Sequence, residues 1–447
     1  MDAHPDTPLP ADFDPAYLVT VDELYHDDWA VHKHLRIRWL RDSLREFWPL
    51  GHPTRLIHVA GTNGKGSTCR LLEAGLGLAG AAGSMTNPHL FDFAERCSVG
   101  GTPLPHADWV RLWRERVQPH SLERAERSRE RGLTFAEAGI LLGLHAFADH
   151  KLDWGVVETG VGGRYSPSMA IQPALCVLTN VGNDHPKTLG HARWQRALEK
   201  AGIARPGVPL ITGATGVALE VIRLVAEQED APLHVVDDAA LFDLKRRAYS
   251  LRDTATLPEH AWRNLALALA TLTLAEPGLD PDVLLQTLLA VPPLPGRFWQ
   301  PRPHLVADVA HNPDKLAALA EQLDVLHPGR PLVLVFGVSR ERELAAMLAP
   351  LATRTARITL TSASYAGRDP RELATECRTA FPDLPLHVEP DPVRALALAE
   401  AGRQDDELVL LTGSAYTVDQ ALNPDPCLKR LNAEYGRRGQ VEGPANR

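Results

Sequence analysis

The sequence predicts an α/β protein of two domains, each built on a sheet of mostly parallel strands. Three observations lead to this fold class. Short runs of Val, Leu and Ile alternate with longer helical patterns, which is typical of βαβ units. The chain has 447 residues, more than one hydrophobic core usually organises. The alternation breaks at residues 291–297, where three prolines and a glycine cannot continue a helix.

The strands and helices are expected in the same rhythm on both sides of this break. In the first domain the apolar runs are residues 56–60, 154–158, 175–180 and 209–212, followed by an Ala- and Leu-rich helix at 260–275. In the second domain they are residues 304–309, 332–337, 358–361 and 408–411, with a helix at 313–326. We therefore predict domains at residues 17–295 and 296–423. We also expect a flexible tail at 1–16 and a disordered, polar tail at 424–447.

Composition excludes several classes of protein. The net charge is -9 and no basic stripe offsets it, which argues against a nucleic-acid-binding surface. No stretch approaches the roughly 20 apolar residues that span a bilayer, and the first residues lack the apolar core of a signal peptide. The five cysteines are scattered without a C-x-x-C pair, so reduced thiols are expected. We expect a cytoplasmic monomer that acts on small molecules.

A glycine-rich segment between the first strand and the next helix has the chemistry of a phosphate-binding loop. It consists of Gly61, Thr62, Asn63, Gly64, Lys65, Gly66, Ser67 and Thr68. The glycines let backbone N–H groups approach an anion, the helix N-terminus adds its dipole, and Lys65 adds a charge. Ser67 or Thr68 offers a hydroxyl to a metal ion. ATP is the expected ligand; the alternative is a purely structural turn between strand and helix.

A set of short motifs gives the chain a family resemblance. The strings are HVAGTNGKGS at 58–67, NPHL at 87–90, ETGVGGR at 158–164, DH at 184–185, EKAGI at 199–203, PGRF at 295–298, DVAHNP at 308–313 and TGS at 412–414. In this order they resemble the folylpolyglutamate synthase and dihydrofolate synthase branch of the Mur ligase superfamily. The resemblance implies a P-loop ATPase domain of the Mur-ligase type, followed by a smaller Rossmann-like glutamate ligase domain.

The resemblance also implies a reaction and its ligands. In this family the carboxylate of a pteroate or folate attacks the γ-phosphate of ATP, and the amine of L-glutamate then attacks the resulting acyl phosphate. The phosphoryl group and the attacking carboxylate are both anionic, so Mg²⁺ and fixed cations must hold them together. A flat pterin is expected between the phosphate loop and residues 134–137, with Phe135 as a wall; core packing is the alternative role for Phe135.

Particular residues inherit roles from the resemblance. Lys65, His185, Lys200, Asp308 and His311 are the expected catalytic residues. Ser67, Asn87, Glu158 and His185 are the expected Mg²⁺ ligands. Asn264 is expected to bind the adenine, while Arg297, in the hinge, is expected to grip the phosphates when the domains close. Lys200 is expected to be carbamylated, although an unmodified lysine would still serve as a cation; a monovalent cation is a further candidate ligand.

Most of these residues also have an ordinary structural interpretation. Glu158, Asp308 and His311 could cap strand or helix ends, His185 could be a turn residue, and Asn264 could lie on an exposed stripe of its helix.

Three departures from the family pattern keep a second class of function open. Residues 165–169 read YSPSM where the family has Leu-Asp-Ala-Thr-Asn, Asn87 replaces a serine, and Asn183 replaces a leucine. The altered loop puts substrate recognition in doubt. The alternatives to a folate ligase are therefore a ligase for another acid and an ATP-binding relative without catalysis.

Overall fold

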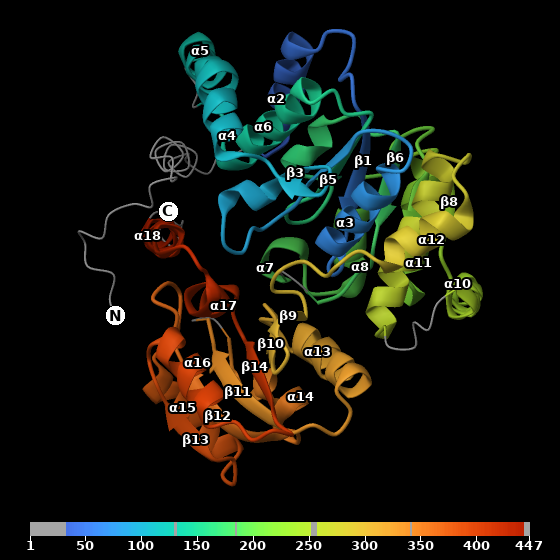
Figure 1. Ribbon diagram of the computed structural model, residues 1–447. Helices are drawn as coiled ribbons and strands as arrows, with labels where there is room; N and C mark the ends of the chain where they lie inside the picture. Colours follow the sequence, from blue (N-terminus) through green and yellow to red (C-terminus); the bar gives the residue numbers. More distant parts are fainter. Residues whose placement is uncertain (1–32, 129–131, 184–185, 252–256, 340–341, 442–447) are drawn as a thin grey trace.

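The structure, a computed structural model, describes residues 33–128, 132–183, 186–251, 257–339 and 342–441, and these form two lobes (Figure 1). Each lobe is built on one sheet, the first of eight strands and the second of six. The predicted α/β fold is therefore confirmed. Within those ranges no helix combines the length and apolar character needed to cross a membrane.

The first sheet is parallel in its centre and antiparallel at one edge. Its strand order is β4-β3-β2-β5-β1-β6-β7-β8, with β3 antiparallel to both of its neighbours. The strands are β1 (Arg55–Ala60), β2 (Ala82–Met85), β3 (Cys97–Val99), β4 (Thr102–Pro103), β5 (Trp154–Glu158), β6 (Leu175–Leu178), β7 (Leu210–Thr212) and β8 (Leu233–Val235). All four strands predicted in this domain are present, at the centre of the sheet.

Strand β1 shows why these runs are apolar throughout. Leu56 and Ala60 belong to one buried cluster, while Ile57 and Val59 belong to the cluster on the other face of the sheet. A strand that is covered by helices on both faces needs apolar residues at every position, without alternation.

The helices of the first lobe connect these strands. They are α2 (Lys33–Phe47), α3 (Lys65–Leu76), α4 (His106–Leu112), α5 (Gln118–Ser128), α6 (Phe135–Asp149), α7 (Pro186–Leu189), α8 (Arg193–Ala201), α9 (Gly216–Gln228), α10 (Asp238–Leu251), α11 (Glu259–Ala275) and α12 (Pro281–Leu289). Short 3₁₀ helices occur at η1 (Phe93–Arg96) and η3 (Pro167–Ala170), and one π-helical turn, η2 (Trp113–Val117), joins α4 to α5.

The second sheet has the order β13-β12-β11-β14-β10-β9, parallel except for β9. Its strands are β9 (Trp299–Arg302), β10 (Leu305–Ala307), β11 (Leu332–Gly337), β12 (Thr355–Thr361), β13 (Leu386–Val388) and β14 (Leu408–Thr412). Its helices are α13 (Pro313–Leu326), α14 (Leu344–Ala352), α15 (Pro370–Ala380), α16 (Pro392–Ala401) and α17 (Ala415–Leu422). Strand β9 begins just after the predicted junction.

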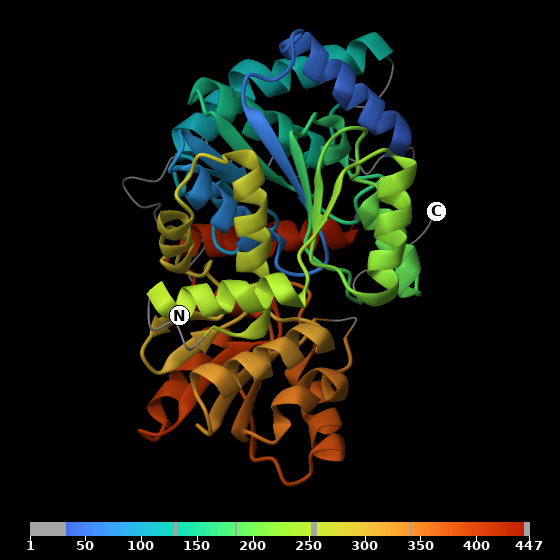
Figure 2. The ribbon, with the colours of Figure 1, turned by 90° about the vertical axis from the view of Figure 1, so that its right-hand side faces the viewer.

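The end of the chain differs from the expected disordered tail. Residues 426–441 form helix α18 (Pro426–Val441), which Figure 2 shows, in red, at the level of the first lobe. Leu428 and Leu431 are buried in a core cluster of that lobe. The prediction was wrong because two buried leucines in a polar segment are too weak a pattern to indicate packing against a distant domain.

Polar contacts also hold the segment that includes α17 and α18 against the first lobe. Asp419 of α17 accepts hydrogen bonds from the side-chain amides of Asn423 and Asn432, at 2.7 and 3.2 Å. Both amides also donate to the carbonyl oxygen of Phe91 in the first lobe. Burial raises the pKa of Asp419 to about 7, with nearby Glu95 adding to the rise, while the two amides and Lys429 oppose it.

This buried carboxyl makes a prediction about stability. The pKa of Asp419 is higher in the folded state than in the unfolded chain, so the folded state holds the proton more tightly and stability falls as pH rises from about 4 to 7. Asp419→Asn keeps the acceptor oxygen and removes the titration. We expect the variant to match the wild type near pH 4 and to exceed it by roughly 2–4 kcal/mol at pH 8. Denaturant unfolding at both pH values measures this; a constant difference would contradict it.

Candidate active site

The phosphate loop connects β1 to α3, and two of its glycines are required by close contacts. Gly61 has φ 144° and Gly64 has φ 79°, conformations that L side chains rarely adopt. A Cβ atom on Gly61 would lie 1.9 Å from Thr179 Oγ1. A Cβ atom on Gly64 would lie 2.2 Å from Asn264 Oδ1. The loop is therefore pressed against the end of β6 on one side and against α11 on the other.

Asn180, which follows β6, fixes the conformation of the loop. Its Oδ1 accepts from the N–H of Asn63 at 3.0 Å, its Nδ2 donates to the carbonyl of Asn63, and its own carbonyl accepts from the N–H of Thr62. The Thr62 hydroxyl accepts from the N–H of Gly182. The N–H groups of Thr62 and Asn63 are thus used inside the protein. The N–H groups that remain available to a phosphate are therefore those from Gly64 onward, at the N-terminus of α3.

Lys65 and Glu158 bring opposite charges to this N-terminus. The Lys65 ammonium lies 3.8 Å from Glu158 Oε1, and Glu158 Oε2 accepts from the N–H of Asn87 at 2.8 Å. Glu158 is buried at the carboxyl end of β5, one strand from the loop. Burial raises its pKa, opposed by Lys65, the Asn87 N–H, Arg297 and Arg96 in that order. The positive charges of Lys65, Arg297 and Arg96 reduce the free-energy cost of ionising this buried carboxylate.

The donors around Glu158 suit a hard divalent cation. The Thr68 hydroxyl is buried and has no hydrogen-bond partner among the described residues, and half-buried Ser67 lies beside it in the first turn of α3. Carboxylate and hydroxyl oxygens next to a phosphate loop are the ligands that Mg²⁺ combines with phosphate oxygens and water. The Asn87 side chain, also an expected ligand, accepts a hydrogen bond from Arg96 Nη1.

Lys200 lies against the start of the phosphate loop. It is on α8, only 2% exposed, and its ammonium donates to the carbonyl of Gly61 at 3.0 Å. The glycine-rich segment after Glu158 packs on the end of α8, because a Cβ on Gly163 would lie 2.7 Å from the Lys200 carbonyl oxygen. Gly163 therefore allows the segment after β5 to pack closely against α8.

Three expected site residues come from the junction and the second lobe. Arg297 acts on carboxylates of both lobes, because it opposes the burial-driven rise in pKa of Glu158 and of Asp308. The two Asp308 oxygens accept from the N–H groups of Phe298 and Ala310, both at 2.7 Å. Asp308 thus orders the hinge and the strand end, as its structural interpretation proposed.

His311 is held neutral near pH 7. Burial lowers its pKa to about 4, with Lys315, Arg297 and Arg342 contributing. Its Nδ1 lies 2.8 Å from the carbonyl oxygen of Val309, and its Nε2 lies 3.1 Å from the Lys315 ammonium. The carbonyl requires a proton on Nδ1, so Nε2 is an acceptor.

The structure brings together most of the predicted residues but not all. Asn264 is buried against Gly64, which excludes the alternative that it lies on an exposed stripe of its helix. His185 lies outside the described residues. Sequence reasoning missed Asn180 and Arg96. Asn180 carried a usable signal, since a polar residue directly after a central parallel strand lies at the edge where ligands bind.

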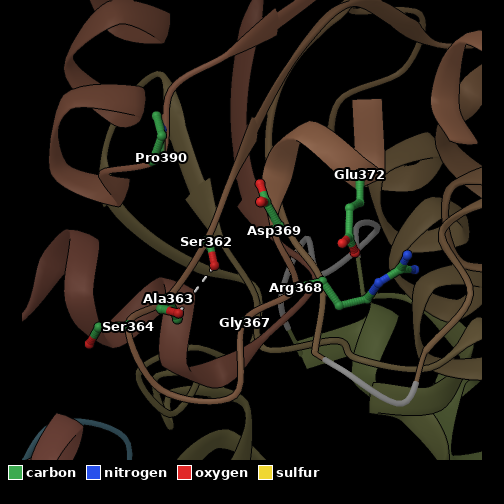
Figure 3. Close-up of a pocket in the computed structure, with 8 residues that line it drawn as sticks. All are labelled: Ser362, Ala363, Ser364, Gly367, Arg368, Asp369, Glu372 and Pro390. Atoms are coloured by element: carbon green, nitrogen blue, oxygen red, sulfur yellow. Dashed lines mark hydrogen bonds between the residues drawn. The ribbon is translucent and has the colours of Figure 1, made fainter. Parts of the chain in front are cut away.

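A separate hollow of about 580 Å³ lies at the carboxyl end of β12 (Figure 3). Its lining is Ser362, Ala363, Ser364, Gly367, Arg368, Asp369, Glu372 and Pro390, none of which was predicted to belong to the site. Arg368 is already hydrogen-bonded to Glu376, so Asp369 and Glu372 leave the rim acidic. Such a rim is a poor match for anionic substrates.

Comparison with known proteins finds relatives named as dihydrofolate synthases and folylpolyglutamate synthases. Residues 298–415 match the family model described as Mur ligase, glutamate ligase domain. The chain is 31% identical over 396 residues to the dihydrofolate synthase/folylpolyglutamate synthase of Bacillus subtilis (strain 168), covering 83% of this chain and 90% of that protein.

Solved structures resemble it over almost the whole chain. Mycobacterium tuberculosis folylpolyglutamate synthase complexed with ADP has a TM-score of 0.77 at 24% identity, over 97% of this chain and 99% of that one. The bifunctional folylpolyglutamate synthase/dihydrofolate synthase of Yersinia pestis, complexed with AMPPNP and Mn ion, has a TM-score of 0.72 at 26% identity, over 92% and 98%.

The contact between Gly64 and Asn264 makes a prediction about nucleotide binding. Gly64→Ala places a Cβ in a left-handed conformation and against Asn264 Oδ1, so the loop must move. We expect the affinity for a non-hydrolysable ATP analogue to fall at least tenfold, measured by calorimetry. Gly207→Ala is the matched control, because Gly207 has φ 71° and a Cβ added there would meet nothing within 4 Å. It should lose stability but not affinity; equal affinities for all three proteins would contradict the prediction.

Proposed function

This chain belongs to the dihydrofolate synthase and folylpolyglutamate synthase family, and we propose that it is an ATP-dependent ligase that joins L-glutamate to dihydropteroate or a reduced folate. The observation that carries the proposal is the charge arrangement at the junction of the lobes. Buried Glu158 of the first lobe and half-buried Asp308 of the second lie near enough to Arg297, beside the phosphate loop, for its charge to oppose the rise in their pKa values. The proteins of Yersinia pestis and Mycobacterium tuberculosis described above, solved with nucleotides, support the ATP assignment.

The reaction proceeds in two transfers. A carboxylate oxygen of the acceptor attacks the γ-phosphorus of ATP, the bond to the β-phosphate oxygen breaks, and ADP leaves. The deprotonated amine of glutamate then attacks the acyl phosphate carbon, and inorganic phosphate leaves as the amide forms. Both steps bring anions together, so fixed cations contribute most to the rate.

The residues of this chain divide that task. Lys65 and Arg297 supply positive charge to the phosphates, the first from the loop and the second from the hinge. Mg²⁺, held by Glu158, Ser67 and phosphate oxygens, would supply further charge neutralisation when bound. On the second lobe the Nε2 of neutral His311 accepts from the Lys315 ammonium, and it would suit the ammonium or amine of the entering glutamate in exchange for Lys315. Asn264, buried beside the loop, is placed to meet the base of the nucleotide.

We further propose that the protein acts as a cytoplasmic monomer on small molecules, without nucleic-acid or membrane partners. Its net charge of -9 supports the absence of nucleic-acid partners.

The assay of the proposed function combines MgATP, L-glutamate and 7,8-dihydropteroate or a reduced folate. ADP and phosphate should be released in step with the new amide, and only when all three substrates are present, because the acyl phosphate is shielded from water until the amine arrives. If neither dihydropteroate nor any reduced folate stimulates ADP release while nucleotide still binds, the folate assignment fails and a panel of other acids should be tested.

Variants at two glutamates test whether this turnover depends on the candidate active site. Glu158→Gln keeps an acceptor for the Asn87 N–H but removes the charge, and we expect turnover to fall at least 100-fold with the fold intact. Glu276→Gln is the control, because Glu276 pairs with Arg55 at the opposite end of β1. Its turnover should match the wild type.

The proposal also concerns the covalent modification of Lys200. We propose that its amine is carbamylated by CO₂, giving an anionic group beside Gly61 and the metal-binding residues. Turnover should then fall when dissolved CO₂ is removed and recover when bicarbonate is added, and the mass of the intact protein under CO₂ should rise by one carbamate. Turnover that is indifferent to bicarbonate would leave Lys200 as a plain cation.

A further inference from the structure

Arg96 lies at the end of a loop that is rigidly folded on itself. The Glu95 carboxylate accepts from the N–H groups of Leu90, Phe91 and Asp92, at 2.8, 3.0 and 3.0 Å. The carbonyl of Arg96 accepts from the N–H of Thr86, at the start of the loop. These bonds fix the backbone from which the Arg96 side chain extends, so the guanidinium is held in one place.

The side-chain partners of Arg96 are all neutral. Its Nε donates to His89 Nδ1 at 2.8 Å, and its Nη1 donates to Asn87 Oδ1. Because His89 Nδ1 accepts this hydrogen bond, it carries no proton and the ring is uncharged. The guanidinium carbon also lies 5.4 Å from the centre of the Phe93 ring and 5.1 Å from that of Phe135.

Some half-buried or buried arginines of the first lobe are paired with a carboxylate, while buried Arg196 donates to backbone carbonyl oxygens instead. Arg36 is paired with Glu137 at 2.6 Å, and Arg70 lies 3.9 Å from Glu73. Among the residues that the structure describes, Arg96 has no carboxylate within ion-pair distance and its Nη2 donates to no protein atom. A fixed guanidinium with uncharged partners and N–H groups to spare is suited to receive an anion in two parallel hydrogen bonds.

The location of Arg96 indicates which anion this is. One of its partners, Asn87, also donates its N–H to Glu158 beside the phosphate loop. Another, Phe135, belongs to the segment expected to line the pocket for a flat aromatic acceptor. An aromatic acid stacked along Phe135 with its carboxylate on Arg96 would place that carboxylate next to Glu158, where the γ-phosphate is expected.

We propose that Arg96 binds the acceptor substrate's carboxylate and orients it toward the γ-phosphate. This inference rests on the proposed function, because it assumes an aromatic acid as acceptor. It makes Arg96 a residue that selects carboxylic acids over neutral analogues, separate from the residues that bind ATP.

The test compares two ligands in the full-length protein with a non-hydrolysable ATP analogue and Mg²⁺ present. The ligands are 7,8-dihydropteroate and its carboxamide, which has the same shape without the charge. The wild type should bind the carboxylate 10- to 100-fold more tightly, the range for a charge-assisted pair of hydrogen bonds. Arg96→Met should lose that preference, with the affinities for the carboxamide and for the nucleotide analogue unchanged.

Two further variants separate charge from structure. Arg96→Lys keeps the positive charge without the planar fork, so a reduced preference for the carboxylate should remain. Arg111→Met is the matched control, because Arg111 pairs with Asp108 and Asp149 on the same lobe, and its preference should equal that of the wild type. If Arg96→Met weakens both ligands equally, or keeps the full preference, the proposal is overturned. A wild type that binds neither ligand would instead overturn the proposed function, and this inference with it.

Discussion

The close packing of the phosphate loop against β6 and α11 is the constraint on which the rest of the site depends. Without a side chain, Gly61 approaches Thr179 and Gly64 approaches Asn264, and Asn180 then uses the N–H groups of Thr62 and Asn63. The remaining N–H groups point from the start of α3, and Lys65 is brought within 3.8 Å of Glu158. Catalytic charges are thus positioned by backbone contacts that only glycine permits.

The central strands were predictable from the sequence because both faces of each sheet are covered, which makes every position apolar. Strand β2 (Ala82–Met85) was missed although it is equally buried, since Ala-Gly-Ser-Met has no strand-forming composition and becomes a strand through pairing with β5 and β3. Edge strands β4 and β8 are two and three residues long, too short for a pattern. Helix α18 depends on contacts with a domain distant in sequence, which local patterns do not encode.

For the site, the phosphate loop and Glu158 could be predicted because their chemistry is local, whereas Arg96 could not. Arg96 follows Glu95 in the sequence, which suggests a surface ion pair between them. In the structure, however, Glu95 accepts hydrogen bonds from backbone N–H groups, and Arg96 donates to Asn87 and His89. One residue of the altered loop at 165–169 also makes a contact that is distant in sequence. Ser168 occupies the place of the family threonine and keeps its hydroxyl, which lies 2.9 Å from Nε2 of buried His58.

The described residues of the two lobes contact each other at several places, including a hydrogen bond from the Asn183 N–H to Asp314 Oδ2 at 3.3 Å, and these contacts restrict how the lobes can move. At the hinge, a Cβ on Gly296 would lie 2.8 Å from Leu90, and Phe91 packs edge-on against Trp299. At a second junction, Asn423 and Asn432 bind the Phe91 carbonyl, and Leu428 and Leu431 of α18 are buried in the first lobe. Both junctions contact the same loop, so a rotation that preserves them has its axis near this loop. Arg96 and Asn87 would then keep their positions during such a rotation, while parts of the second lobe away from this loop would move. Such an arrangement would hold the acceptor still and make delivery of the amine the step that depends on closure.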